Sequence, residues 1–303
     1  MTPTTGRIDA FEAKAGALLH RIRRPLRDAL ILAGIGRAIF YFWVQGVQPW
    51  TFAGVDARAY WGIDLAHPYA QSTLGGISSF LYSPAFAQAF APFSLLPWPV
   101  FWGLWTVMNI AVFIWLVRPW PWVVPMLILP ITYELFVGNV HFLLAAIAVI
   151  GIRAALVWPF PVLTKITPGV GALWLAGRGQ WRLFTLAVGS TIAITAVSYL
   201  LNPGAWSEWL AFLTADPSGA EQLPLRLAVA AGILFIGARR GWAWTVAVAV
   251  WLAMPVIYVN SWVVLLGTIR LARVDLGKPG SLIPWRHARS ESRSDPGSDP
   301  AAA

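Results

Sequence analysis

A short polar segment, GVDARAYW, carries the residues best suited to acid–base chemistry. It places Asp56 four residues before Tyr60 and two before Arg58. If this segment is helical, Asp56 and Tyr60 lie on one face, one turn apart. A carboxylate beside aromatic side chains, just beyond an apolar segment, can act as a general base on a hydroxyl group. Asp64 is the competing carboxylate, and a loop aspartate is often only solvated.

Lys165 is the second candidate, because it lies within the apolar segment PFPVLTKITPG. Three prolines, Pro159, Pro161 and Pro168, each remove a backbone hydrogen-bond donor, so we expect this segment to be a broken helix. Broken helices at membrane depth line cavities rather than face lipid. An ammonium group beside such a cavity suits a phosphate or another anion. The alternative is a lysine that snorkels from a distorted helix end.

Four other ionisable side chains lie within apolar segments, where an unpaired charge is costly. Arg37 and Arg153 are long enough to snorkel towards a headgroup. Glu134 is expected either to close an internal ion pair, with Lys165 as the first partner to test, or to act directly. His141 is expected either to pack through hydrogen bonds or to contact substrate.

Other catalytic classes find no support in the sequence. It has no Cys, no Cys/His cluster, no GxSxG elbow, no P-loop and no HExxH. The carboxylates are too scattered for a paired-acid site to be read from their spacing. Serine hydrolase, ATPase and zinc protease activities are therefore disfavoured, and we expect neither a metal nor a cofactor.

The elements that position these residues are apolar. Hydrophobic residues make up 58% of the chain and charged residues 12%, about half the share in a soluble protein. The 19 Trp and 23 Pro also fit a bilayer. We expect an all-α, polytopic membrane protein whose domain covers 28–273 and contains about ten spanning or re-entrant segments. These segments are 28–47, 83–97, 99–117, 121–137, 140–157, 159–176, 183–201, 224–238, 242–255 and 257–269.

The net charge of +9 gathers at the two ends of the chain. By the positive-inside rule, a basic arm (1–27) and a disordered tail (274–303) are cytoplasmic, and the loop 48–81 faces outward. We therefore expect a multi-pass protein of the cell membrane, in contact with membrane lipids. No nucleic-acid-binding motif accompanies the charge, so a nucleic-acid partner is not expected.

Four elements, in this order, carry a family resemblance. They are VDARAYW, FLYSPAFAQAFAPFSLLPWPVFWGLW, GNVHFLL and KITPG. Together they resemble glycosyltransferase family 87, polytopic GT-C mannosyltransferases that use a polyprenyl-phosphate sugar. The resemblance is clear over about residues 28–182, and the remainder agrees by hydropathy.

The resemblance implies a GT-C-like membrane domain that transfers a hexose, mannose in the family, to an outward-facing glycolipid or glycan acceptor. Asp56 would be the general base, and the anomeric configuration would be inverted. The residues expected to bind the phosphate or sugar of the donor are Arg58, Tyr60, Tyr82, His141 and Lys165. Packing at the membrane interface is the alternative role for the tyrosines. The lipid-linked sugar is a co-substrate, and no metal is implied.

Two other functions remain open. A transporter or flippase for lipid-linked sugars would share the spans, the broken segments and the buried charges. It would have no general need for the outer loop and its carboxylate. A non-catalytic membrane scaffold related to the family would fit the short length of the chain and PVIYVNSW, which lacks the His of a Pro-x-x-Trp-x-His element.

Overall fold

The structure is a computed structural model that describes residues 24–46, 49–70, 72, 79–215 and 221–274. Within these ranges the regular elements are all helices, which confirms the all-α class. The basic arm 1–27, except its last four residues, and the tail 274–303, except its first, lie outside the described residues. The predictions for both therefore stay predictions.

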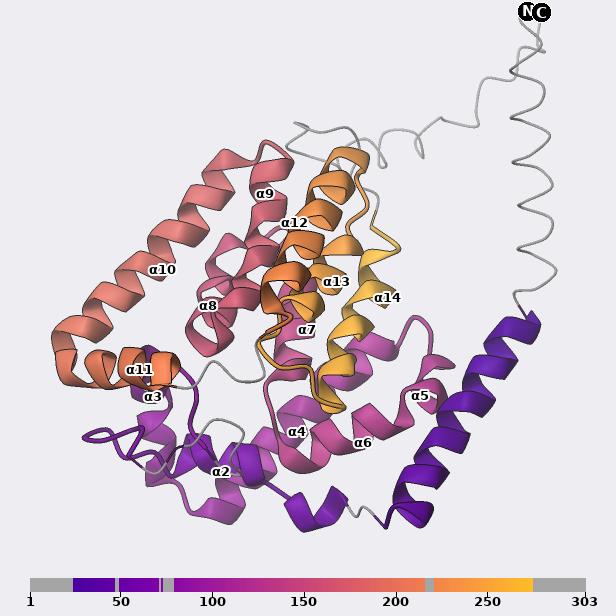
Figure 1. The fold of residues 1–303 in the computed structure, drawn as a ribbon, viewed down its shortest axis with the longest axis horizontal. Coiled ribbons are helices and arrows are strands. Elements are labelled where there is room, and N and C mark those ends of the chain that lie inside the picture. Colours follow the sequence, from indigo (N-terminus) through magenta and orange to yellow (C-terminus); the bar gives the residue numbers. More distant parts are fainter. Residues whose placement is uncertain (1–23, 47–48, 71, 73–78, 216–220, 275–303) are drawn as a thin grey trace, which may run out of the picture.

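The first helix covers residues 24–39 and continues as the π-helical η1 (Phe40–Val44). It stands beside the rest of the molecule, nearest to α5 and α6 (Figure 1). Gly34 lies so close to Met126 that a Cβ there would overlap the Met126 backbone. The rings of Tyr41 and Tyr133 meet edge to face at 5.8 Å. Arg37 is exposed on this helix.

The predicted outer loop begins with η2 (Pro49–Phe52) and the short helix α2 (Val55–Trp61). The predicted 83–97 segment is not one continuous helix. It consists of two short helices, α3 (Pro84–Phe90) and η3 (Ala91–Leu95). The hydroxyl of Ser83 caps α3, and the chain turns again at Pro97 before α4 (Trp98–Val117). Of these elements, those before α4 lie together at one end of the molecule (Figure 1).

Most of the following apolar runs are divided into short helices. In order they are α5 (Val123–Met126), α6 (Ile128–Val137), α7 (His141–Ile150), η4 (Ala155–Val157), α8 (Pro159–Lys165), η5 (Thr167–Ala172), α9 (Leu173–Gly177), α10 (Trp181–Leu201), α11 (Pro203–Ala215), α12 (Leu223–Arg240), α13 (Thr245–Leu252), η6 (Asn260–Leu266) and α14 (Gly267–Leu271). Arg153 lies exposed in the turn after α7.

Two helices of the described chain, α4 and α10, are long and apolar enough to cross a membrane. A third span results if α6 and α7, bent by 108°, are counted as one broken span. The expectation of about ten spanning or re-entrant segments is therefore not confirmed. Hydropathy records only how apolar a segment is. In this chain, prolines and glycines divide many of the apolar segments into helices that are too short to cross a membrane singly.

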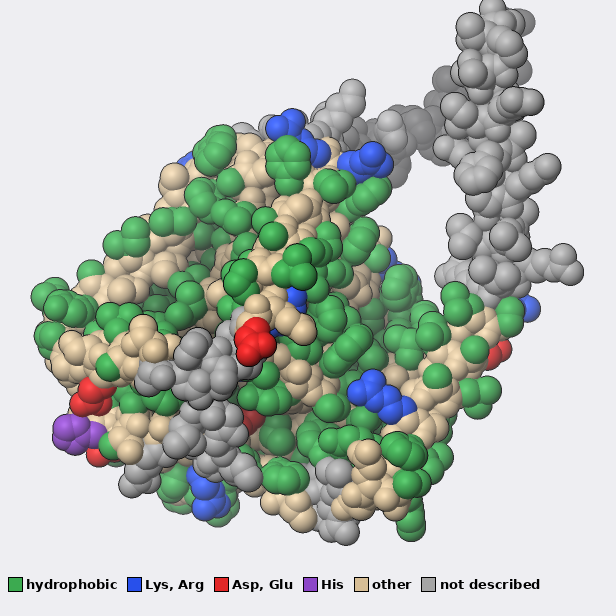
Figure 2. Space-filling view, viewed as in Figure 1, with side chains coloured by type: hydrophobic (Ala, Val, Ile, Leu, Met, Phe, Trp, Pro, Cys, Tyr) green, Lys and Arg blue, Asp and Glu red, His purple; other side chains and the backbone are tan. Residues whose placement is uncertain are grey.

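The surface of the long helices is strongly apolar. Leu104 on α4 is 60% exposed, and Ile192 and Leu200 on α10 are 62% and 79% exposed. Hydrophobic side chains dominate the face shown in Figure 2, and charged ones are few. A soluble protein rarely exposes so large an apolar surface, which is typical of contact with lipid. The structure thus indicates a membrane protein.

Candidate active site

Two glycines in left-handed turns dock α2 against the end of α6. Gly54 and Gly138 both have φ of +72°, and the Gly54 N–H donates to the Phe136 carbonyl at 2.7 Å. A Cβ on Gly138 would lie 2.9 Å from the Cβ of Ala57 and 2.6 Å from the Trp102 ring. Glycine is therefore needed at this turn both for its conformation and for the close approach. The contact presents Asp56 to the bend between α6 and α7.

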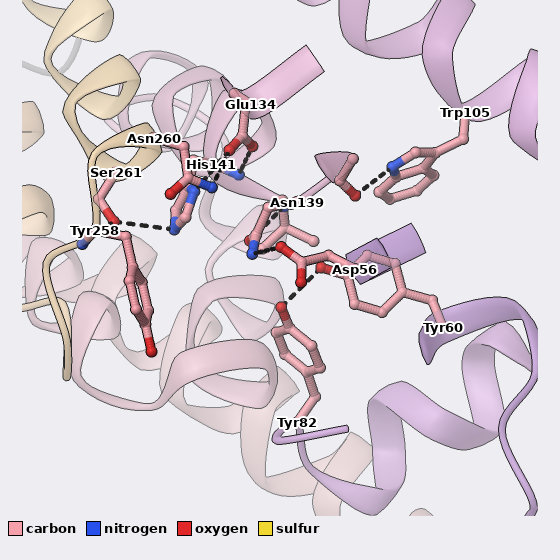
Figure 3. Close-up of polar contacts among 12 residues, drawn as sticks. Asp56, Tyr60, Tyr82, Trp105, Glu134, Asn139, His141, Tyr258, Asn260 and Ser261 are labelled. Carbon is pink, nitrogen blue, oxygen red and sulfur yellow. Dashed lines mark hydrogen bonds and ion pairs between the residues drawn. The ribbon is translucent and has the colours of Figure 1, made fainter. Parts of the chain in front are cut away.

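Asn139, in that bend, holds the Asp56 carboxylate. Its Nδ2 donates to Asp56 Oδ2 at 2.6 Å, and its Oδ1 accepts from the Val140 N–H at 2.7 Å, which fixes the amide orientation (Figure 3). No described group donates to the other carboxylate oxygen, Oδ1. Burial raises the pKa of Asp56 above its ordinary value, and Asn139 and Lys165 act against this shift. The site thus holds one oxygen and leaves the other free to accept a proton.

Lys165 ends α8, which breaks as its prolines predict. The next residue, Ile166, has φ +58° and ψ −72°, a strained conformation for a β-branched side chain. The Lys165 ammonium lies 5.5 Å from the centre of the Tyr82 ring. Within the described residues it makes no hydrogen bond and no ion pair within 4 Å. It is a half-buried, unpaired cation whose charge acts on Asp56.

Tyr60 and Tyr82 lie beside the Asp56 carboxylate, close enough to interact with its charge (Figure 3). Their hydroxyls share a hydrogen bond of 2.8 Å, and they are 0% and 5% exposed. The Tyr60 ring also packs edge to face against Phe86, Phe90 and Trp105. Because their rings are covered by other aromatic rings, packing rather than stacking on a sugar is the role this arrangement favours.

Glu134 and His141 form a fully buried pair beside Asn139 (Figure 3). Glu134 Oε1 accepts from the His141 N–H at 2.7 Å, and Oε2 lies 2.9 Å from His141 Nδ1. Asn260 Nδ2 donates to Oε2 at 2.9 Å, and Ser261 Oγ lies 3.4 Å from His141 Nε2. Glu134 therefore pairs with His141 rather than Lys165. Since His141 is 0% exposed, the structure favours its packing role over substrate contact.

The other two candidates of the outer loop lie apart from this cluster. Arg58 is exposed, with its guanidinium 4.5 Å from the centre of the Trp98 ring. It projects from another side of α2 than Asp56 because the two residues are two positions apart in a helix. Asp64 is exposed and accepts the N–H of Ala66 at 2.9 Å, closing a local turn. Neither residue reaches Asn139 or Lys165.

The segment PVIYVNSW supplies residues that the sequence did not single out as a site. Asn260 and Ser261 complete the buried network, and Tyr258, 46% exposed, lies beside it (Figure 3). The sequence feature that could have identified them is the cluster of polar residues, Tyr258, Asn260 and Ser261, within an apolar run. No group of three His, Asp or Glu side chains in the described chain is placed to hold a metal ion.

Comparison with known proteins identifies the family. The sequence model of glycosyltransferase family 87 matches residues 80–278, more than half of the chain. No curated protein and no solved structure matches the chain. The matched region includes Glu134, Asn139 and Lys165, and the fold brings Asp56, which precedes it, against Asn139. The resemblance predicted from the sequence is thereby confirmed, and the chain belongs to glycosyltransferase family 87.

Proposed function

We propose that this membrane glycosyltransferase transfers a hexose, mannose, from a polyprenyl phosphate to a hydroxyl of an outward-facing glycolipid or glycan, with inversion. The observation that carries the proposal is the Asp56 carboxylate, held at Oδ2 by Asn139 and without a donor at Oδ1 among the described residues. A half-buried ammonium, Lys165, acts on the same carboxylate. A base and an unpaired cation at one site fit a transfer that removes a proton and releases a phosphate.

In this mechanism Asp56 Oδ1 takes the proton of the acceptor hydroxyl. The acceptor oxygen then attacks the anomeric carbon from the face opposite the phosphate. The bond from that carbon to the phosphate oxygen breaks, and the electron pair leaves with the polyprenyl phosphate. A pKa above the ordinary aspartate value makes Asp56 a stronger base once it is ionised.

Lys165 has the complementary role of stabilising the departing phosphate. The negative charge on the leaving group grows as the bond breaks, so a fixed cation binds the transition state more tightly than the intact donor. The ammonium is free for this role because no described carboxylate lies within 4 Å of it. The lipid tail of the donor would lie in the bilayer, with its head at the outer face of the cell membrane and both chain termini in the cytoplasm.

The donor class can be tested with purified protein and a pool of acceptor lipids. We expect sugar transfer from labelled polyprenyl-phosphate mannose, none from nucleoside-diphosphate mannose, and a product whose anomeric configuration, read by NMR, is inverted. Polyprenyl-phosphate glucose provides the control for mannose specificity. Movement of the intact lipid-linked sugar across vesicles, without transfer, would contradict the proposal in favour of a flippase. Neither transfer nor movement by well-folded protein would favour a scaffold.

A further inference from the structure

A second candidate binding region lies near the far end of α4 from α2. It is an apolar cavity of about 540 Å³ between α5, α13 and the η6–α14 segment. Four tryptophans line it, Trp120, Trp122, Trp244 and Trp262, and no charged residue does. We call this cavity the tryptophan groove. Met126, which also lines it, is the residue that Gly34 of the first helix contacts.

Three arginines stand close to one side of this groove. Arg270 on α14 lies near enough to Arg118 and Arg273 to interact with their charges. The Arg273 guanidinium lies 5.9 Å from the centre of the Trp120 ring, which lines the groove. No ion pair in the described part of the chain includes any of the three. We call them the arginine cluster.

Two members of the arginine cluster are held by backbone carbonyls rather than by carboxylates of the described residues. Arg270 donates from Nε to the Trp115 carbonyl at 2.8 Å and lies 4.6 Å from the centre of that ring. Arg273 donates to the Pro119 carbonyl at 3.3 Å. These contacts orient the guanidinium groups of Arg270 and Arg273, and no described carboxylate lies within 4 Å of any of the three arginines. Such a cluster suits a phosphate group, to which guanidinium donates paired hydrogen bonds.

The groove is separate from the Asp56 site. Trp102, which packs against Gly138 beside Asp56, and Arg118, the C-cap of α4, are sixteen residues apart on one helix. This separation is about 24 Å along the helix axis, most of the thickness of a bilayer. The arginine cluster and Asp56 therefore lie at different depths, and they belong to opposite faces of a membrane that α4 crosses.

We propose that the tryptophan groove and the arginine cluster bind an anionic phospholipid. An acyl chain would lie between the tryptophans, and the phosphate would lie against the guanidinium groups. The uncharged lining fits a hydrocarbon chain, and the unpaired charges beside it select an acidic headgroup over a zwitterionic one. Tryptophan at the headgroup level is the usual arrangement at a membrane interface.

The test uses the full chain, purified in detergent and delipidated, with phosphatidylglycerol and phosphatidylcholine of identical acyl chains as probes. Native mass spectrometry gives the affinity for each lipid. We expect phosphatidylglycerol to bind more tightly, and Arg118→Gln with Arg273→Gln to weaken it roughly 25-fold, about fivefold for each surface charge removed. Both arginines are exposed, so the variant should fold. Equal affinity for the two lipids, or an unchanged affinity in the variant, would overturn the proposal.

Two further variants separate a groove from a merely basic surface. Arg182→Gln with Arg239→Gln removes two exposed charges elsewhere and should leave the affinity unchanged within twofold. Val248→Trp, which fills the groove, should abolish binding although the arginines remain. If the Arg182→Gln, Arg239→Gln variant loses as much affinity for phosphatidylglycerol as the arginine-cluster variant, net charge alone explains the binding and the proposal fails. Displacement of phosphatidylglycerol by an equal concentration of polyprenyl phosphate would instead make the donor lipid the occupant.

Discussion

Glu134 provides the sharpest test of the buried network. The change Glu134→Ala removes both carboxylate oxygens and leaves three buried donors without an acceptor: the His141 N–H, His141 Nδ1 and Asn260 Nδ2. Each buried donor left unsatisfied costs about 1–3 kcal/mol. Because neighbouring side chains can relax, the loss should be smaller than the sum over the three donors. We therefore expect the free energy of unfolding to fall by about 3–5 kcal/mol, as for a broken buried pair.

The change Glu134→Gln should be milder, for a reason set by the same contacts. A glutamine with its oxygen at the Oε2 position keeps the bonds from His141 Nδ1 and Asn260, at 2.9 Å each. Its NH₂ group then faces the His141 N–H, and two donors cannot bond to each other. One unsatisfied contact predicts a loss of about 1–3 kcal/mol.

The control is a chemically identical change at an exposed pair. Glu208 lies 3.2 Å from His67, with side chains 38% and 68% exposed. Exposed pairs contribute about 0–1 kcal/mol, so Glu208→Gln should be nearly neutral. Thermal unfolding of each purified variant in one detergent measures the order of stability. If Glu134→Gln and Glu134→Ala both unfold at the same temperature as Glu208→Gln, the hydrogen-bonded network around Glu134 is wrong.

Three further predictions concern the site itself. Gly138→Ala should lower transfer and stability together, by more than about 1 kcal/mol, because its Cβ would overlap Trp102; unaltered thermal unfolding and transfer would contradict the docking of α2. Lys165→Leu should lose transfer yet unfold no earlier than wild type, because no ion pair is broken; joint loss of both would indicate a structural cation. The raised pKa of Asp56 predicts a pH–rate profile whose acid limb lies above pH 3.8. The same shift predicts that Asp56 makes a contribution to the free energy of unfolding that is fully present below pH 3.8 and is lost as the pH rises through the raised pKa. Asp56→Asn should abolish this pH dependence of stability.

The sequence predicted what depends on neighbours along the chain. Asp56 and Tyr60 are four residues apart and share a helix, and the prolines around Lys165 break α8 where expected. The family assignment rested on the same local elements. Local spacing was sufficient in these cases because one helical turn, or one missing N–H, decides the outcome.

Contacts between distant segments could not be predicted in the same way. Asp56 meets Asn139 across 83 residues, and Glu134 meets Asn260 across 126. Glu134 pairs with His141 rather than Lys165 because the α6–α7 bend turns the histidine towards it. The expected number of spans is not confirmed for a related reason: hydropathy records apolar content and not the direction of the chain.

The measurement that tests the central claim most directly is transfer from labelled polyprenyl-phosphate mannose by Asp56→Asn, with Asp64→Asn as the matched control. Both changes replace a carboxylate with an amide in the same loop, but only Asp56 is bonded to Asn139. At equal amounts of folded protein, we predict that Asp56→Asn lowers kcat/KM by about 10²–10⁴-fold and that Asp64→Asn stays within a few fold of wild type. Transfer by Asp56→Asn at the wild-type rate would contradict this mechanism, because the general base would then be another residue.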